Sequence, residues 1–201
     1  MQQVYIVNTG FANLASVKAA LERIDATPIV TESKVDIQNA RFLILPGVGN
    51  FGAAIEKLSS AALIETLRKR FQSGLPTLSI CLGFQLLAKA SEEDNNCIGL
   101  GAINSEVIRL KTALPVPQIG WNKVIPDAGC SMIKPGFAYF ANSFAYVEID
   151  DGWNKSYFAY ENRYIAAIER DNLLACQFHP ELSGEYGQNL LKQWIRRGIS
   201  Q

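Results

Sequence analysis

Short apolar runs alternate with amphipathic segments along the first part of the chain. Residues 4–7, 27–31 and 41–45 are mainly apolar or β-branched, and a turn-forming or polar segment follows each of them. Runs of this length without regular polar alternation are typical of strands that are buried on both faces of a parallel sheet. We therefore expect three such strands here.

Helical periodicity fills the spaces between these runs. Residues 14–24 repeat apolar side chains at helical spacing, and Asn13 directly before them is suited to cap the first turn. Residues 53–58, 63–71 and 184–197 show further amphipathic patterns. We predict an α/β fold, an open and mostly parallel sheet with helices on both faces.

After residue 106 the pattern changes to short strand-like segments separated by turns. We expect strands at residues 107–110, 121–125, 138–140, 146–149, 156–160 and 164–168, and a further buried strand at 173–178. Consecutive short strands favour an antiparallel meander, which we expect to pack on the α/β core as a small antiparallel addition. We predict that residues 1–201 form a single domain.

Composition narrows the classes of function. The 201 residues include 19 Lys and Arg and 19 Asp and Glu, and this balance argues against a nucleic-acid binder. No apolar run approaches the roughly 20 residues of a membrane span, and the N-terminus lacks a signal-peptide pattern, so we expect a cytoplasmic protein. Four cysteines without paired spacing and a single histidine indicate neither a disulfide framework nor a metal site, and we expect no cofactor.

Cys81 lies at the corner between a predicted strand, residues 76–80, and a predicted helix that begins near Phe84. Ser79 and Gly83, two residues to either side, are small, as a sharp turn close to neighbouring elements requires. This is the layout of a nucleophile elbow, and a helix that starts there would favour a thiolate. The alternative is a buried core thiol, because free cysteines are commonly buried.

The single histidine supplies the second half of a candidate site. His179 follows the predicted buried strand, and Glu181 stands two residues further on. An imidazole that takes the proton of a thiol creates a nucleophile at neutral pH, and a carboxylate fixes the tautomer of the imidazole and stabilises its charge. An isolated histidine is more often structural, but together with an elbow cysteine these residues predict a catalytic triad of Cys81, His179 and Glu181.

The carboxyl ends of parallel strands meet at one edge of a sheet, where open α/β proteins bind their ligands. The loops after residues 7, 45 and 80 all lie at that predicted edge. Attack on an amide creates an oxyanion that needs preorganised N–H donors. We expect these donors at Leu82 and in the turn with Val48 and Gly49, where flanking glycines let a peptide unit sit or flip. The alternative is a turn that only ends the strand.

Five segments of the chain resemble the class I (triad) glutamine amidotransferases. They are residues 45–49 (Leu-Pro-Gly-Val-Gly), 80–85 (Ile-Cys-Leu-Gly-Phe-Gln), 91–93 (Ser-Glu-Glu), 120–122 (Gly-Trp-Asn) and 177–181 (Gln-Phe-His-Pro-Glu). The likeness runs over essentially the whole chain and implies a flavodoxin-like fold. Within the family, residues 8–14 and the Gly-Trp-Asn segment are similar to the glutaminase subunits of imidazole glycerol phosphate synthase, an enzyme of histidine biosynthesis.

The resemblance implies a reaction and a substrate site. Cys81 would attack the side-chain amide of L-glutamine, releasing ammonia and forming a glutamyl thioester. Water would then release L-glutamate, with His179 as acid and base. Gln85 and Glu93 match positions that hold the amino-acid head group of the substrate. The further substrate-binding positions are Gly47, Asn142 and Ser143.

The resemblance also implies a protein partner. In the family, ammonia travels through a cyclase subunit with a (β/α)₈ barrel, so that the two subunits form a heterodimer. Asn13 and Trp121 match positions that face this partner. Trp121 would otherwise be interpreted as a core aromatic side chain.

The sequence departs from the family at several positions. Ser79 replaces a usual glycine, Gln118-Ile119 replaces His-Met, Asn142 replaces a histidine, and Leu182 stands where a basic residue is usual. These changes lie where the family meets its partner or controls activation. They leave open a paralogous amidotransferase subunit that supplies ammonia to another synthase, for example in surface-sugar biosynthesis.

Two further classes remain as alternatives. Related cysteine hydrolases of the protease or chaperone type tend to place a histidine directly after the nucleophile, where this chain has Leu82. A catalytically silent flavodoxin-like binding subunit is the other alternative, and the complete triad argues against it.

Overall fold

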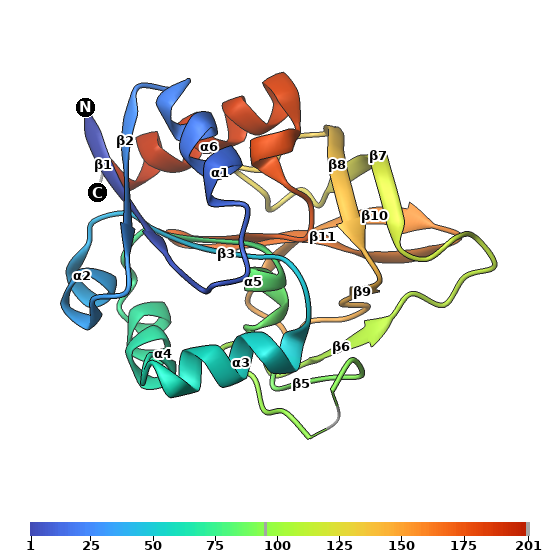
Figure 1. The fold of residues 1–201 in the computed structure, drawn as a ribbon. Helices are drawn as coiled ribbons and strands as arrows, with labels where there is room; N and C mark the ends of the chain where they lie inside the picture. Colours follow the sequence, from blue (N-terminus) through green and yellow to red (C-terminus); the bar gives the residue numbers. More distant parts are fainter. Residues whose placement is uncertain (95, 200–201) are drawn as a thin grey trace.

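The computed structural model describes residues 1–94 and 96–199. Its main feature is a nine-stranded sheet with the order β2-β1-β3-β4-β12-β11-β10-β7-β8 (Figure 1). The first five strands of this order run parallel. They are β2 (Ala26–Thr31), β1 (Gln2–Val7), β3 (Leu43–Gly47), β4 (Thr77–Cys81) and β12 (Leu173–Cys176).

The antiparallel strands continue the same sheet beyond β12. They are β11 (Asn162–Arg170), β10 (Asn154–Tyr160), β7 (Gln118–Pro126) and β8 (Gly136–Asn142). We expected these strands to form a meander packed on the α/β core. In the structure they instead extend the edge of the core sheet, through the pairing of β11 with β12. The predicted fold class, a mostly parallel α/β sheet with an antiparallel addition, is confirmed.

A small second sheet has the order β5 (Ala90–Ser91), β6 (Glu106–Arg109) and β9 (Phe144–Ala145). The strand expected at residues 146–149 is wrong, because this segment has no regular structure. Tyr146 is fully buried there, and its hydroxyl lies 3.2 Å from the carbonyl oxygens of Phe84 and Gln85. Tyr146 and Ile149 are therefore buried as single side chains rather than as part of a strand, and Val147 between them is exposed.

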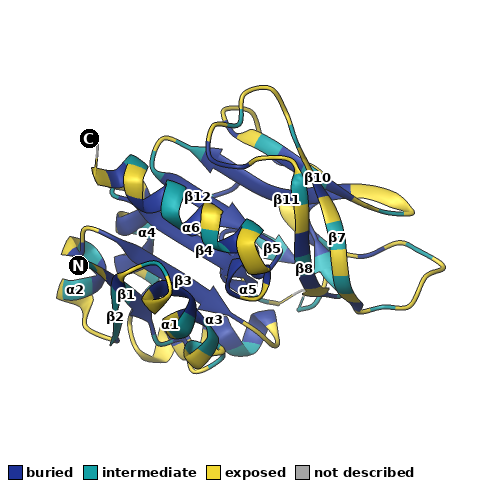
Figure 2. Ribbon diagram, turned by 90° about the horizontal axis from the view of Figure 1, so that it is seen from above, coloured by how far each residue is buried: buried dark blue, intermediate teal, exposed yellow. Residues whose placement is uncertain are grey.

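Helices cover both faces of the parallel part of the sheet (Figures 1 and 2). Helices α1 (Leu14–Glu22) and α6 (Gly184–Ile199) lie on one face, and α2 (Lys34–Asn39), α3 (Phe51–Ser60) and α4 (Ile64–Gln72) lie on the other. Asn13 caps α1, as expected, by accepting from the Ser16 N–H at 3.2 Å. Helix α2 was not predicted, because six residues with one buried side chain, Ile37, carry too little periodicity.

Alternate residues of the parallel strands belong to two separate cores. Ile6 and Ile44 pack in the core under α1 and α6, whereas Val7, Leu43 and Leu45 pack under α3 and α4. The central strands β3, β4 and β12 are accordingly dark blue along their whole length in Figure 2. Burial on both faces explains why these strands show continuous apolar runs in the sequence.

A buried arginine holds the amino ends of β3 and β4 together. Arg70 of α4 is 1% exposed. Its guanidinium donates to Thr77 Oγ1 at 2.9 Å, to the Pro76 carbonyl oxygen at 2.7 Å and to the carbonyl oxygen of Ala40. Neutral oxygens thus surround the buried cation and replace its hydration.

Gly83 is required where the turn after β4 passes beneath β3. A β-carbon at this position would lie 2.0 Å from the Leu45 carbonyl oxygen, so the backbone must shift to accept any side chain. We predict that Gly83→Ala lowers the free energy of unfolding by about 1–3 kcal/mol, the usual cost of overpacking. Urea denaturation should show a lower midpoint with an unchanged slope.

Ser79→Ala in β4 is the matched control. Ser79 is fully buried and its hydroxyl has no hydrogen-bond partner among the described residues. Removing an unpaired buried hydroxyl should leave stability unchanged or raise it by about 1 kcal/mol. Equal destabilisation by both substitutions would contradict the assignment of the Gly83 effect to the contact with β3.

Candidate active site

Cys81 ends β4 in a strained backbone conformation. Its φ of 53° and ψ of −111° lie in a region that residues with a side chain rarely adopt. The residue is 5% exposed. The helix that follows, α5 (Leu82–Gln85), has only four residues. The expected elbow is present, but so short a helix provides little of the dipole that we expected to favour a thiolate.

His179 and Glu181 come from the segment that leaves β12. The His179 Nδ1 and Glu181 Oε1 atoms lie 2.8 Å apart, and both side chains are buried. Burial lowers the pKa of His179, but the charge of a Cys81 thiolate, its hydrogen bond and Glu181 outweigh burial and raise this pKa from 6.5 to about 10. The arrangement therefore favours the protonated imidazolium form of His179 beside the Cys81 sulfur at neutral pH.

A second side chain from the same segment contacts the sulfur, and we did not assign it a role from sequence. Gln177 Nε2 lies 3.6 Å from Cys81 Sγ, and Gln177 Oε1 accepts from Gln85 Nε2 at 3.0 Å. Gln85 Nε2 also donates to the Phe144 carbonyl oxygen at 3.0 Å. The available signal was position alone: Gln177 precedes His179 by two residues, the period that returns a side chain to the same side of an extended chain.

Cys81 and His179 line a pocket of about 230 Å³ at the carboxyl edge of the parallel strands. This volume is below the usual range for drug-sized ligands and suits a small molecule. The sequence-predicted residues on its wall are Val48, Gly49, Cys81, Leu82, Gln85, Glu93, Asn142, Ser143 and His179. Pro117, Ala141 and Phe144 also line it and were not predicted. Glu181 lies behind His179, outside the wall formed by the described residues.

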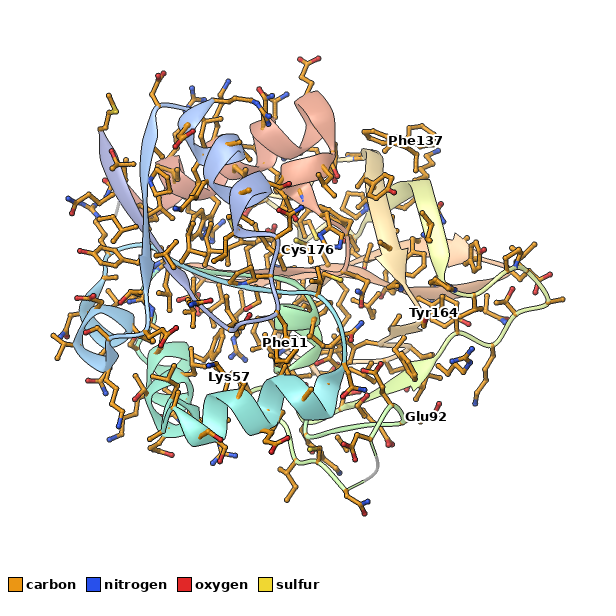
Figure 3. All side chains as sticks on the ribbon, viewed as in Figure 1. Phe11, Lys57, Glu92, Phe137, Tyr164 and Cys176 are labelled. Carbon is orange, nitrogen blue, oxygen red and sulfur yellow. The ribbon has the colours of Figure 1, made fainter. Side chains whose placement is uncertain are left out.

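The turn after β3 does not offer the Val48 N–H to the pocket in this conformation. That N–H donates to the Phe11 carbonyl oxygen at 2.6 Å. Figure 3 shows Phe11 in the loop that runs close to α3 and Lys57. Gly49 follows with a φ of +99°. An oxyanion role for Val48 therefore requires rotation of this peptide unit, a possibility that the flanking glycines had suggested.

Gly47 and Glu93 have structural contacts of their own. A β-carbon at Gly47 would lie 2.9 Å from Leu82 Cβ, so this glycine allows β3 to pack against the elbow and is not part of the described pocket wall. Glu93 is half-buried, and its Oε2 accepts from the Phe51 N–H at the start of α3 at 2.7 Å. The carboxylate thus has a fixed position at the pocket.

Asn13 and Trp121 lie outside the pocket on the surface. Trp121 in β7 is 58% exposed, which excludes the alternative of a core aromatic, and it packs edge to face on Tyr139 of β8. Ile119 and Phe137 on the same two strands are 67% and 59% exposed. Figure 3 shows Phe137 at the outer end of β8. Exposed apolar residues gathered in this way mark a candidate protein-binding surface.

Within residues 1–94 and 96–199, no group of three or more His, Cys, Asp or Glu side chains is placed to hold a metal ion. In the same residues, no helix is long and apolar enough to cross a membrane.

The family model for class-I glutamine amidotransferases matches residues 5–197. The chain belongs to this family. Its relatives include the "Imidazole glycerol phosphate synthase subunit HisH" of Salmonella typhimurium, which is 39% identical over 196 residues and covers 96% of this chain and 98% of the relative. The protein of the same name from Prochlorococcus marinus is 35% identical over 203 residues, covering 98% of each chain.

Solved structures support the amidotransferase fold. A crystal structure described as a glutamine amidotransferase matches with a TM-score of 0.78 at 18% identity, covering 98% of this chain and 99% of that one. A chain of PurLQS from Thermotoga maritima matches with a TM-score of 0.74 at 18% identity, covering 97% and 98%.

The only histidine of this amidotransferase offers a direct test of the ion pair. His179 is the only histidine of the chain, so the titration of its ring protons can be followed by NMR without distinguishing them from those of another histidine. We predict that Cys81→Ala lowers the pKa of His179 by about 1–3 pH units, because the negative partner is removed.

The matched control is Cys176→Ala. Burial raises the pKa of the Cys176 thiol far above its ordinary value, so this cysteine is uncharged and its removal should leave the titration of His179 nearly unchanged. An unchanged His179 pKa in Cys81→Ala would show that no thiolate accompanies the imidazolium.

Proposed function

We propose that this amidotransferase is the glutaminase subunit of an imidazole glycerol phosphate synthase. It would hydrolyse L-glutamine and deliver the ammonia to a cyclase subunit in L-histidine biosynthesis. The observation that carries the proposal is the buried contact of Cys81 with His179, which in turn contacts Glu181, at a small pocket. Relatives that bear this name over nearly the full length of the chain support the pathway.

The first half of the reaction forms a thioester. The Cys81 sulfur attacks the side-chain amide carbon of glutamine, and the negative charge moves to the amide oxygen. The His179 imidazolium gives its proton to the amide nitrogen, the carbon–nitrogen bond breaks, and ammonia leaves. Glu181 keeps the imidazole in the required tautomer through Nδ1, so that Nε2 faces the reacting atoms.

The second half releases glutamate. Neutral His179 takes a proton from water, whose oxygen attacks the thioester carbon. The carbon–sulfur bond then breaks, which returns the thiolate and leaves the proton on His179. The same ion pair is thereby restored for the next molecule of glutamine.

The oxyanion of both steps needs two N–H donors. We assign one to the backbone of Leu82, directly after the nucleophile. The second comes from the peptide unit of Val48 and Gly49 after it leaves the Phe11 carbonyl oxygen, which would link this loop to the catalytic state. We assign the head group of glutamine to Gln85 and Glu93, together with Asn142 and Ser143, which line the same pocket.

The cyclase subunit, expected to be a (β/α)₈ barrel, would dock on the exposed face of β7 and β8. Trp121 provides the large apolar anchor of this face, and Ala141 connects it to the active site. Ala141 lines the pocket and is paired in register with the exposed Ile119. A partner on this face would meet the pocket mouth and could receive ammonia there. Asn13 would form a second contact with the partner. Separately, we assign all 201 residues to one domain.

Glutamate release from glutamine tests this proposal. We expect low activity of the purified chain alone, a sharp rise with a cyclase subunit and its ribulosyl ligand, and no activity of Cys81→Ala in either mixture. Cys81→Ala should still bind the cyclase, which separates loss of chemistry from loss of assembly.

Two other outcomes would contradict parts of the proposal. Glutaminase activity that does not depend on the cyclase would indicate that the chain is a subunit of another synthase. The departures from the family pattern at Gln118 and Asn142 motivate this alternative. No activity in any mixture, with an unreactive Cys81, would leave only a binding subunit.

Substitution of the surface tryptophan tests the docking face. We predict that Trp121→Ala weakens binding to the cyclase by about 2 kcal/mol, as expected for a central aromatic anchor, or about 30-fold in Kd. Titration calorimetry would measure it. Val35→Ala on α2 is the control, because Val35 is 66% exposed near the opposite edge of the sheet. Equal binding of both variants would place the interface elsewhere.

A further inference from the structure

Gln177 is a polar side chain with no exposed surface, and its amide group bonds at both ends. Its Oε1 accepts from Gln85, and its Nε2 points to the Cys81 sulfur at 3.6 Å. Its backbone N–H donates to the Ala166 carbonyl oxygen at 2.8 Å, which ties the residue to the sheet directly after β12. Both the position and the direction of the side chain are therefore fixed.

The order of donors and acceptors along this chain of bonds decides which end of the amide meets the sulfur. The carbonyl oxygen of Phe144 can only accept, so Gln85 must present its NH₂ group there. The same NH₂ group faces Gln177, which must therefore accept the hydrogen bond with its oxygen. The Gln177 NH₂ group is then left to face Cys81. The opposite orientation of Gln177 would set two NH₂ groups against each other and an oxygen lone pair against the sulfur.

We infer that Gln177 is a further catalytic residue, which donates a hydrogen bond to the Cys81 thiolate and stabilises it for attack. The inference rests on the proposed role of Cys81 as the nucleophile. A hydrogen bond to the charged form of a group favours that form. The dipole of the short α5 helix adds little to the stabilisation of the thiolate. Gln85 is the positioning residue, because it holds Gln177 in the donating orientation.

The bond acts in both halves of the reaction. It supports the thiolate before attack, and it is available again when the thiolate leaves the thioester carbon. It also adds a second contact to the sulfur, since His179 and Gln177 both contact the same atom. No proton moves from Gln177, so the atoms and charges of the reaction remain as described above.

The pH dependence of alkylation by iodoacetamide tests the inference without glutamine or a partner. The rate must be read on the peptide that contains Cys81, because the chain has three other cysteines. We expect Gln177→Met, which keeps length and burial but loses the donor, to move the midpoint of the Cys81 rate profile up by about one pH unit, or about tenfold less thiolate at a given pH.

Gln177→Glu supplies the second variant. It preserves the shape of the side chain and can still accept from Gln85, but it places an oxygen in front of the sulfur. We expect a larger upward shift than in Gln177→Met. Gln118→Met is the matched control, because Gln118 is a 3% exposed amide that makes no bond to the sulfur, and its Cys81 profile should equal that of the wild type.

Two results would overturn the inference. One is a wild-type midpoint in both Gln177 variants, and the other is a uniform loss of rate at all pH values without a shift, which would indicate packing alone. Thermal unfolding of each variant verifies that the fold is intact, and Gln177→Glu decides the matter if Gln177→Met does not fold. Because alkylation needs no substrate, a shifted profile would stand even if the chain proved not to be a glutaminase.

Discussion

The active site depends on holding Cys81 in a backbone conformation that this residue would not adopt by itself. A left-handed φ at a residue with a side chain costs about 1–3 kcal/mol and persists only where the surroundings determine it. Here β4 is paired on both edges, by β3 and by β12. Gly47 of β3 and Gly83 of the following turn let the two segments approach closely without a side chain between them. At the other end of β4, Arg70 fixes the strand to its neighbour.

The same pairing explains why the catalytic groups meet. Cys81 ends β4, and the residues that bond to its sulfur leave the end of β12, the strand directly beside it. Gln177 and His179 stand two residues apart in this extended segment and therefore reach the sulfur from one side, while Glu181 lies behind the histidine. A one-residue shift in the register of β12 would turn these side chains to the opposite face. The register of two central strands thus determines the chemistry.

Sequence patterns were sufficient to predict a structural feature wherever it depends on local residues, or on the rule that the carboxyl ends of parallel strands meet at one edge of the sheet. The buried strands, the elbow at Cys81, the cap at Asn13 and the gathering of loops at one edge were all predicted in this way. The errors arise where a feature depends on contacts between distant segments. The length of α5, the burial of Tyr146 outside a strand and the bond of Val48 to Phe11 are examples. Gln177 belongs with these, because its role depends on Gln85 and Phe144.

Two of the departures from the family pattern, Gln118 and Asn142, lie next to each other in the structure. Gln118 and Asn142 are paired in register on β7 and β8, and both side chains are buried, whereas Trp121 of β7 is exposed. Among the described residues, neither amide atom of Gln118 nor the Oδ1 of Asn142 has a partner. Unpaired buried polar atoms favour small polar molecules as neighbours. At this end of the two strands, polar side chains therefore face inward near the pocket, and the exposed apolar side chains of Ile119 and Trp121 face outward. Binding at the outer side would act on the same two strands that border the site where ammonia forms.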